Sequence, residues 1–178
     1  AAWEWANLSS YTSQIERVIY AVFVCGLIYV VSYLSVEWVL VASVTWWIIA
    51  TLFVLSFPET GSYWKSRWVR GIIGVFVLVP MWKTLVFIRS ADLEAVSDIS
   101  SLWLILYMLL LVWSADVGAY FSGKAWGKSK LAPKVSPGKS WEGAWGGVAS
   151  TALLAVISAI ILDLSTIFTI QLILITIL

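Results

Sequence analysis

Residues 114–147 read SADVGAYFSGKAWGKSKLAPKVSPGKSWEGAWGG, and they form the polar, glycine-rich and lysine-rich segment of an otherwise apolar chain. A carboxylate, Asp116, lies near the end of an apolar run, and five lysines with interspersed serines and glycines follow it. Such a segment is suited to holding phosphate groups beside a membrane. We therefore expect the chemistry of the chain to lie here, between two helices that cross a bilayer.

The composition indicates an integral membrane protein. Of the 178 residues, 61% are hydrophobic and 12% are charged, whereas soluble domains have about 25% charged residues. The chain has no histidine, and its one cysteine excludes an internal disulfide or a thiolate metal site. Any metal bound by these residues must have oxygen ligands, which favours Mg²⁺ or a similar hard cation.

The apolar runs predict the fold. Crossing a bilayer takes roughly 20 residues, and five runs reach or approach that length: Val18–Ser35, Glu37–Phe57, Gly71–Ile88, Leu102–Phe121 and Ala144–Asp163. The first residues resemble the end of a helix, and a further run begins near Thr166. We predict an all-α polytopic helix bundle, with five complete transmembrane helices and partial helices at both ends, forming one membrane domain over residues 1–178. We also expect the chain to be a fragment of a longer protein.

The basic residues predict the orientation of these helices. Cytoplasmic loops accumulate Lys and Arg, and one set of alternate loops contains nine of the eleven basic residues: Arg17, Lys65, Arg67, Arg70, Lys124, Lys128, Lys130, Lys134 and Lys139. The other set contains Glu37, Asp92, Glu94, Asp98 and Asp163, with Arg89. We therefore predict that residues 122–143 form a cytoplasmic phosphate-binding loop.

Asp116 is a candidate site residue because a charged carboxylate within a transmembrane helix costs about 2 kcal/mol or more unless it faces water, a cation or a partner. The alternative is an ion pair with a neighbouring lysine that merely closes the helix end. Small residues recur every four positions around it and again in the next helix, which predicts close packing of the two helices. These residues are Ser114, Gly118 and Ser122, then Ala115, Ala119 and Gly123, and later Gly143 and Gly147.

The loop itself has features of a phosphate site. Pro133 and Pro137 prevent a continuous helix, and Gly138 permits a tight turn, so we predict a polar turn at 136–140. This turn would carry Lys139 between Ser136 and Ser140, where the side chains and backbone amides can hold a phosphate. It is not a Walker loop, because proline occupies the first glycine position and no strand precedes it. Alternatively, the lysines only set the orientation or attract anionic lipid.

The segment SADVGAYFSGKAWGKSKLAPKVSPGKSWEG closely resembles the central part of bacterial phosphatidate cytidylyltransferase, also called CDP-diacylglycerol synthase. The likeness extends with decreasing strength over most of the chain. It implies an enzyme of phospholipid biosynthesis in the bacterial inner membrane that converts CTP and phosphatidate to CDP-diacylglycerol and pyrophosphate. It also implies Mg²⁺ as cofactor, membrane lipid but no nucleic acid as partner, and a possible homodimer.

This resemblance suggests roles for individual residues. Asp116 and Lys139 would be catalytic, with Asp116 on the side of the metal. Lys134, Ser136, Ser140 and Lys128 would bind the substrates, with Lys128, Lys124 and Lys130 attracting anions in general. Glu142 would either cap the following helix or orient Lys139.

One departure from the family is clear. The carboxylate-rich signature that this family carries further downstream is absent from the 178 residues, so we expect them to be inactive alone. Two other functions remain open: a CTP-dependent polyprenol or lipid kinase, which would release CDP, and a transporter of an anionic metabolite. A transporter should carry polar residues at the middle of its spans, and these spans contain few.

Overall fold

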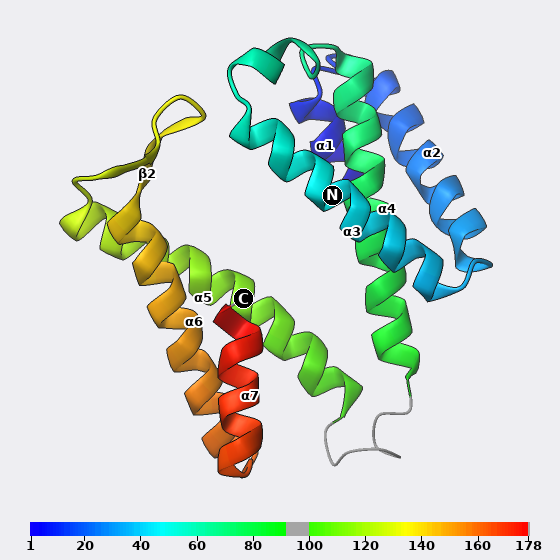
Figure 1. The fold of residues 1–178 in the computed structure, drawn as a ribbon. Helices are drawn as coiled ribbons and strands as arrows, with labels where there is room; N and C mark the ends of the chain where they lie inside the picture. Colours follow the sequence, from blue (N-terminus) through cyan, green and yellow to red (C-terminus); the bar gives the residue numbers. More distant parts are fainter. Residues whose placement is uncertain (92–99, 178) are drawn as a thin grey trace. The chain divides into compact units, whose positions relative to one another are not determined.

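The computed structural model describes residues 1–91 and 100–177 (Figure 1). The chain separates into two compact units, Ala1–Ala91 and Asp92–Leu178. The predicted acidic residues Asp92, Glu94 and Asp98 lie outside the described residues. The prediction of one membrane domain over residues 1–178 stays a prediction.

The predicted all-α membrane fold is confirmed. Five helices in the described part are long and apolar enough to cross a membrane, and each overlaps one predicted span. They are α2 (Gln14–Ser32), α3 (Val36–Leu55), α4 (Arg67–Ser90), α5 (Ser101–Trp126) and α6 (Trp141–Ile161). Shorter helices lie at the two ends, α1 (Ala2–Leu8) and α7 (Thr166–Ile177). A 3-10 turn, η1 (Glu59–Ser62), connects α3 with α4.

In the first unit, α4 packs against α1, α2 and α3. Two glycines on α4 make room for aromatic rings, because a Cβ at Gly74 would overlap Trp5 and Tyr20, and one at Gly71 would lie 3.0 Å from the Tyr11 hydroxyl. The Tyr20 hydroxyl donates a hydrogen bond of 2.8 Å to the Gly71 carbonyl. The core of this unit is therefore aromatic, with Tyr11 and Tyr20 beside Ala6, Val24 and Val79.

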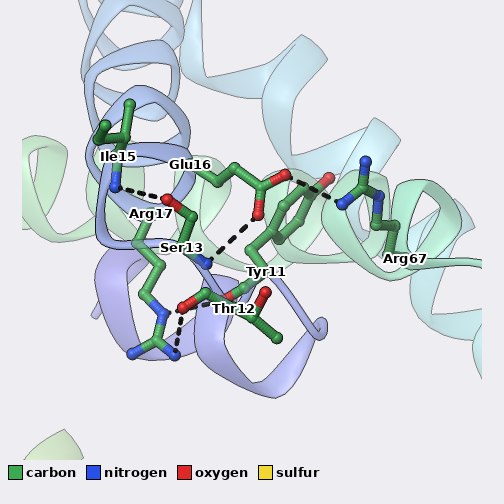
Figure 2. Close-up of polar contacts among 7 residues, drawn as sticks. All are labelled: Tyr11, Thr12, Ser13, Ile15, Glu16, Arg17 and Arg67. Carbon is green, nitrogen blue, oxygen red and sulfur yellow. Dashed lines mark hydrogen bonds and ion pairs between the residues drawn. The ribbon is translucent and has the colours of Figure 1, made fainter.

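Polar contacts organise one end of this unit (Figure 2). Ser13 begins α2 with a capping box, in which its hydroxyl accepts from Ile15 N–H and the Glu16 carboxylate accepts from Ser13 N–H. Arg67, the first residue of α4, forms an ion pair of 3.0 Å with Glu16. The beginnings of α2 and α4 thus lie at the same end of the unit, as the alternation of basic loops predicted.

The second unit is built on the antiparallel pair α5 and α6, with α7 packed against α6 (Figure 1). Two short strands, β1 (Lys130–Ala132) and β2 (Ser136–Ser140), form an antiparallel hairpin between α5 and α6. Lys130 pairs with Ser140 and Ala132 with Ser136, with an irregularity between them.

The hairpin corrects two details of the sequence analysis. Residues 122–143 are not all loop, because α5 continues to Trp126 and α6 begins at Trp141. The predicted polar turn at 136–140 is strand β2, and the turn lies at 133–135. Gly138 has no positive φ and an added Cβ would meet no atom of the described residues within 4 Å, so β2 does not require glycine at this position. Proline is compatible with β2 because the strand has a partner on one side only.

Candidate active site at the hairpin end of the α5–α6 pair

Small residues allow α5 and α6 to pack closely, as predicted. A Cβ at Gly146 would overlap the Ser122 side chain and lie 2.8 Å from the Gly118 carbonyl oxygen. A Cβ at Gly143 would lie 3.0 Å from the Ala119 carbonyl oxygen. Nothing larger than glycine fits at these points without moving the helices apart.

A hydrogen bond adds to this packing. The Ser150 hydroxyl on α6 donates to the Ser114 carbonyl on α5 over 2.6 Å, and it lies 2.9 Å from the Gly147 carbonyl of its own helix. Ser114 is two residues from Asp116 on α5, and Ser150 is about one turn from Gly146 on α6. The backbone that carries Asp116 is therefore held directly against α6.

Hydrogen bonds of Ser129, Ser140, Trp141 and Glu142 join the hairpin to the start of α6. Ser140 is the N-cap of α6, and its buried hydroxyl accepts from Gly143 N–H over 3.2 Å. Trp141 N–H donates to the Ser129 carbonyl over 2.9 Å. Ser129 N–H in turn donates to both carboxylate oxygens of Glu142, at 3.1 and 3.2 Å. These contacts fix the end of β2 against the start of α6, and hence the position of the Lys139 backbone.

The contacts of Glu142 support one of its two predicted roles, the capping of α6, and add a contact to the hairpin. Its carboxylate lies in the first turn of α6, where the helix dipole stabilises a negative charge. It also holds the Ser129 amide across the base of the hairpin. No hydrogen bond or ion pair joins it to Lys139 in the described part of the chain, so capping is supported and orientation of Lys139 is not.

A pocket of about 510 Å³ lies between α5, the hairpin and the start of α6. It brings together three of the predicted site residues, Asp116, Lys139 and Ser140. Asp116 and Lys139 are exposed, and within the described residues Asp116 forms no ion pair with a lysine. The remaining lining includes Ala119, Tyr120, Gly123, Lys124, Leu131, Gly138, Gly143 and Ala144.

The other predicted binding residues do not line this pocket. Lys128 precedes the hairpin and Lys134 lies in its turn, both exposed, while Ser136 begins β2 and is half-buried. Glu142 is engaged with Ser129, as described above. The structure therefore separates the predicted site residues into a group at the pocket and a group along the hairpin.

Lys124 is the residue that sequence reasoning placed outside the site and the structure places in the pocket wall. Its ammonium lies 5.6 Å from the centre of the Tyr120 ring, within reach of a cation–π contact. The signal was present in the sequence, because Asp116, Tyr120 and Lys124 are four residues apart and share one face of a helix. The prediction that α5 ends at Phe121 hid it, since Lys124 then fell in the loop.

The donor chemistry of the pocket fits a limited role in binding Mg²⁺. Within residues 1–91 and 100–177 no three potential metal ligands gather in one place, and Asp116 is the one carboxylate of the pocket lining. Mg²⁺ is commonly held by one or two carboxylates, with water and substrate phosphates as the other ligands. Asp116 fits as such a single ligand, and it does not form a complete metal site.

The fold and the pocket together define a polytopic membrane protein in which a closely packed helix pair carries a pocket with two lysines and a carboxylate in its lining. The sequence pattern of the cytidylyltransferase family matches residues 1–178, and the chain belongs to this family. It is 47% identical over 150 residues to the phosphatidate cytidylyltransferase of Pseudomonas aeruginosa, covering 83% of this chain and 53% of that protein.

A second relative agrees with the first. The phosphatidate cytidylyltransferase of Haemophilus influenzae is 34% identical over 169 residues, which cover 87% of this chain and 58% of that protein. The chain thus spans between a half and three fifths of the length of these relatives. No solved structure matches it.

Proposed function

We propose that the protein to which this chain belongs is a phosphatidate cytidylyltransferase, which converts CTP and phosphatidate to CDP-diacylglycerol and pyrophosphate. The observation that carries the proposal is the pocket that unites Asp116, Lys124, Lys139 and Ser140 beside two membrane helices. Membership of the cytidylyltransferase family supports it, and so do the names of the two relatives.

The reaction needs alignment of two anions more than covalent help from the protein. An oxygen of the phosphatidate phosphate attacks the α-phosphorus of CTP and forms a new P–O bond. The bond from that phosphorus to the oxygen bridging toward the β-phosphate breaks, and pyrophosphate leaves with the electron pair. Catalysis of such transfers rests on positioning and on neutralising the charge of the phosphoryl oxygens.

Lys139 and Lys124 are the residues we assign to these oxygens. They approach the pocket from different elements, Lys139 from β2 and Lys124 from α5, so one phosphate can be held between them. The N-terminus of α6, whose residues Ser140 and Gly143 line the same pocket, adds the positive end of a helix dipole. Lysines placed before the reaction stabilise the charge that develops in the transition state.

Asp116 would hold a Mg²⁺ ion together with the phosphates of CTP. When bound, the ion would neutralise phosphate charge and orient the nucleotide. Asp116 lines the pocket from α5. The hydrogen bond from Ser150 to the Ser114 carbonyl holds this part of α5 against α6. Further ligands would have to come from elsewhere in the complete protein.

The remaining predicted residues receive supporting roles in this proposal. Lys134, Ser136 and Lys128 would guide or contact the phosphates of CTP or phosphatidate along the hairpin, and Glu142 would fix the base of the hairpin. The complete protein would lie in the bacterial inner membrane with the hairpin facing the cytoplasm, where CTP is found. A homodimer is also part of the proposal.

The test is to express the complete protein in membranes that lack their own synthase and to supply labelled CTP and phosphatidate, with and without Mg²⁺. We expect labelled CDP-diacylglycerol and pyrophosphate, formed only when the metal is present. CDP with a lipid phosphate as products would instead identify a lipid kinase. Absence of any product, with protein correctly inserted, would contradict the proposal and favour transport.

A further inference from the structure

A groove runs between α2 and α4 in the first unit, which contains none of the candidate active-site residues. Residues at helical spacing form its walls, four from α2 and four from α4, and its volume is about 460 Å³. It is lined by Tyr11, Glu16, Ile19, Tyr20, Phe23, Trp68, Gly71, Ile72 and Val75. From Glu16 to Phe23 the helix rises about 10 Å. The groove thus begins at the polar end of the unit and extends along the membrane span.

The walls of the groove are largely exposed. Ile19, Phe23 and Ile72 are each more than half exposed, at 62%, 55% and 57%. Gly71 forms its floor without a side chain, and the ring of Tyr20 is held there by the hydrogen bond to the Gly71 carbonyl. An extended hydrocarbon chain matches this long and apolar shape.

Arg67 stands at the polar end of the groove. Its guanidinium lies over the rings of two lining residues, 5.0 Å from the centre of Trp68 and 5.6 Å from that of Tyr11. Figure 2 shows it meeting Glu16 beside the Tyr11 ring. The ion pair uses Nη1 alone, and the Arg67 side chain remains 44% exposed. Stacking on two rings fixes the plane of the guanidinium, so its remaining N–H donors point in a defined direction.

The two other arginines at this end are engaged elsewhere. Arg17 donates to the carbonyls of Tyr11 and Thr12, at 2.8 and 3.5 Å, and Arg70 donates to the Ser10 hydroxyl at 3.0 Å. Glu16 is also occupied, because its second oxygen accepts from Ser13 N–H. Arg67 thus retains its Nε and Nη2 donors for a further acceptor at the groove. The Nε of Arg70 also has no hydrogen-bond partner among the described residues, but this atom is buried.

We propose that this groove binds an anionic phospholipid, with one acyl chain between α2 and α4 and the headgroup phosphate on Arg67. Arginine pairs with phosphate through two parallel N–H donors. The N-terminus of α4, at which Arg67 lies, adds the positive end of the helix dipole. Neither feature favours a headgroup that carries a compensating positive charge, so the site should prefer a net anionic lipid. This lipid is a structural ligand of the first unit and not the substrate at Asp116.

The test uses the complete protein in mild detergent, stripped of lipid and titrated with phosphatidylglycerol or with phosphatidylcholine of identical acyl chains, with bound lipid counted by native mass spectrometry. We expect one phosphatidylglycerol per chain to bind at least about tenfold more tightly than phosphatidylcholine. Arg67→Ala should abolish this preference, whereas Arg89→Ala, at the far end of the same helix, should keep it. Ile72→Trp should fill the groove and weaken the binding of both lipids.

Each other outcome overturns the proposal. Equal affinity of the wild type for the two lipids would leave only an apolar groove. Binding unchanged in Ile72→Trp would mean that another protein segment covers the groove. Loss of the bound phosphatidylglycerol in Asp116→Asn would place the lipid at the candidate active site. If thermal unfolding shows that Arg67→Ala is misfolded, Arg67→Lys, which keeps the charge but loses the paired donors, should still reduce the preference.

Discussion

Asp116 is a charged residue on a helix whose neighbouring positions are small or apolar, and it faces a pocket that also contains two lysines. In the proposed reaction it is the one protein ligand that this chain offers to Mg²⁺. Asp116→Asn keeps the size of the side chain and removes its charge, so we expect the rate of CDP-diacylglycerol formation to fall about 100-fold or more. The measurement is a rate assay on the complete protein over a range of Mg²⁺ concentrations.

The matched control is Asp163→Asn, at the other end of α6. Asp163 has a positive φ of 49°, a conformation that asparagine tolerates equally well. This variant should retain its activity. A full rate in Asp116→Asn, with unchanged dependence on Mg²⁺, would assign the metal entirely to residues outside this chain.

The two lysines of the pocket provide a second test at the residue scale. The sequence analysis assigned Lys139 to catalysis and Lys124 to a general attraction of anions, whereas both lysines line the pocket. We now expect each substitution to lower turnover by about 10- to 100-fold, because each removes a cation placed beside the phosphates. Lys130→Ala, in β1 and outside the pocket lining, is the control and should change turnover less than about threefold. Equal losses of turnover in all three variants would show that the lysines act only by attracting anions in general.

At the scale of helices, the α5–α6 contact depends on glycine at defined positions. Gly146→Ala would place a methyl group against the Ser122 side chain and the Gly118 carbonyl, and such overpacking costs about 1–3 kcal/mol. Gly26→Ala, in α2 where nothing lies within 4 Å of the new Cβ, should be neutral or slightly stabilising. Thermal unfolding of the complete protein in detergent measures both. Equal stability of the two variants would show that α5 and α6 do not pack as described.

The helix pair was predictable from sequence, and the hairpin was not. Serine, glycine and alanine at every fourth position permit one type of close contact between helices, so residues such as Gly118 and Gly147 identified the interface directly. Pro137 and Gly138, by contrast, are compatible with a turn and with a strand that has one free edge. Only the pairing of Lys130 with Ser140 distinguishes them, and pairing is not encoded in local composition.

The same limit applies to individual site residues. Asp116 was identified because it is a carboxylate within an apolar run. Lys139 was identified because it lies between two serines in a segment with proline and glycine. Lys124 was assigned to the loop because the end of α5 was predicted five residues too early. Ser140 was predicted to contact phosphate, and its hydroxyl also accepts from Gly143 N–H as the cap of α6, a role that the sequence analysis did not predict. Helix ends depend on capping contacts that form only in the folded protein, and small errors there move residues into or out of a site.

At the scale of the whole molecule, both units carry basic residues beside their membrane spans. The beginnings of α2 and α4 carry Arg17 and Arg67, and the hairpin after α5 carries five nearby lysines. If every span crosses the membrane once, all of these groups face the same side. That side must be the cytoplasm for CTP to reach the pocket, because nucleotides are found there. The proposed function thus requires the orientation that the positive-inside rule predicts.

Cysteine labelling of the complete protein tests this orientation, in a background in which Cys25 and any cysteine outside these 178 residues are replaced. Cys25 lies in the apolar span α2 and is replaced first by Cys25→Ser. Lys134→Cys, in the turn of the hairpin, or Asp163→Cys, after α6, is then added to that background. In intact spheroplasts a membrane-impermeant thiol reagent should label the Asp163→Cys protein and spare the Lys134→Cys protein. Lysis should expose the latter, because α6 separates the two positions by one crossing of the membrane. Labelling of Lys134→Cys in intact spheroplasts would place the pocket outside the cell and remove the proposed access to CTP.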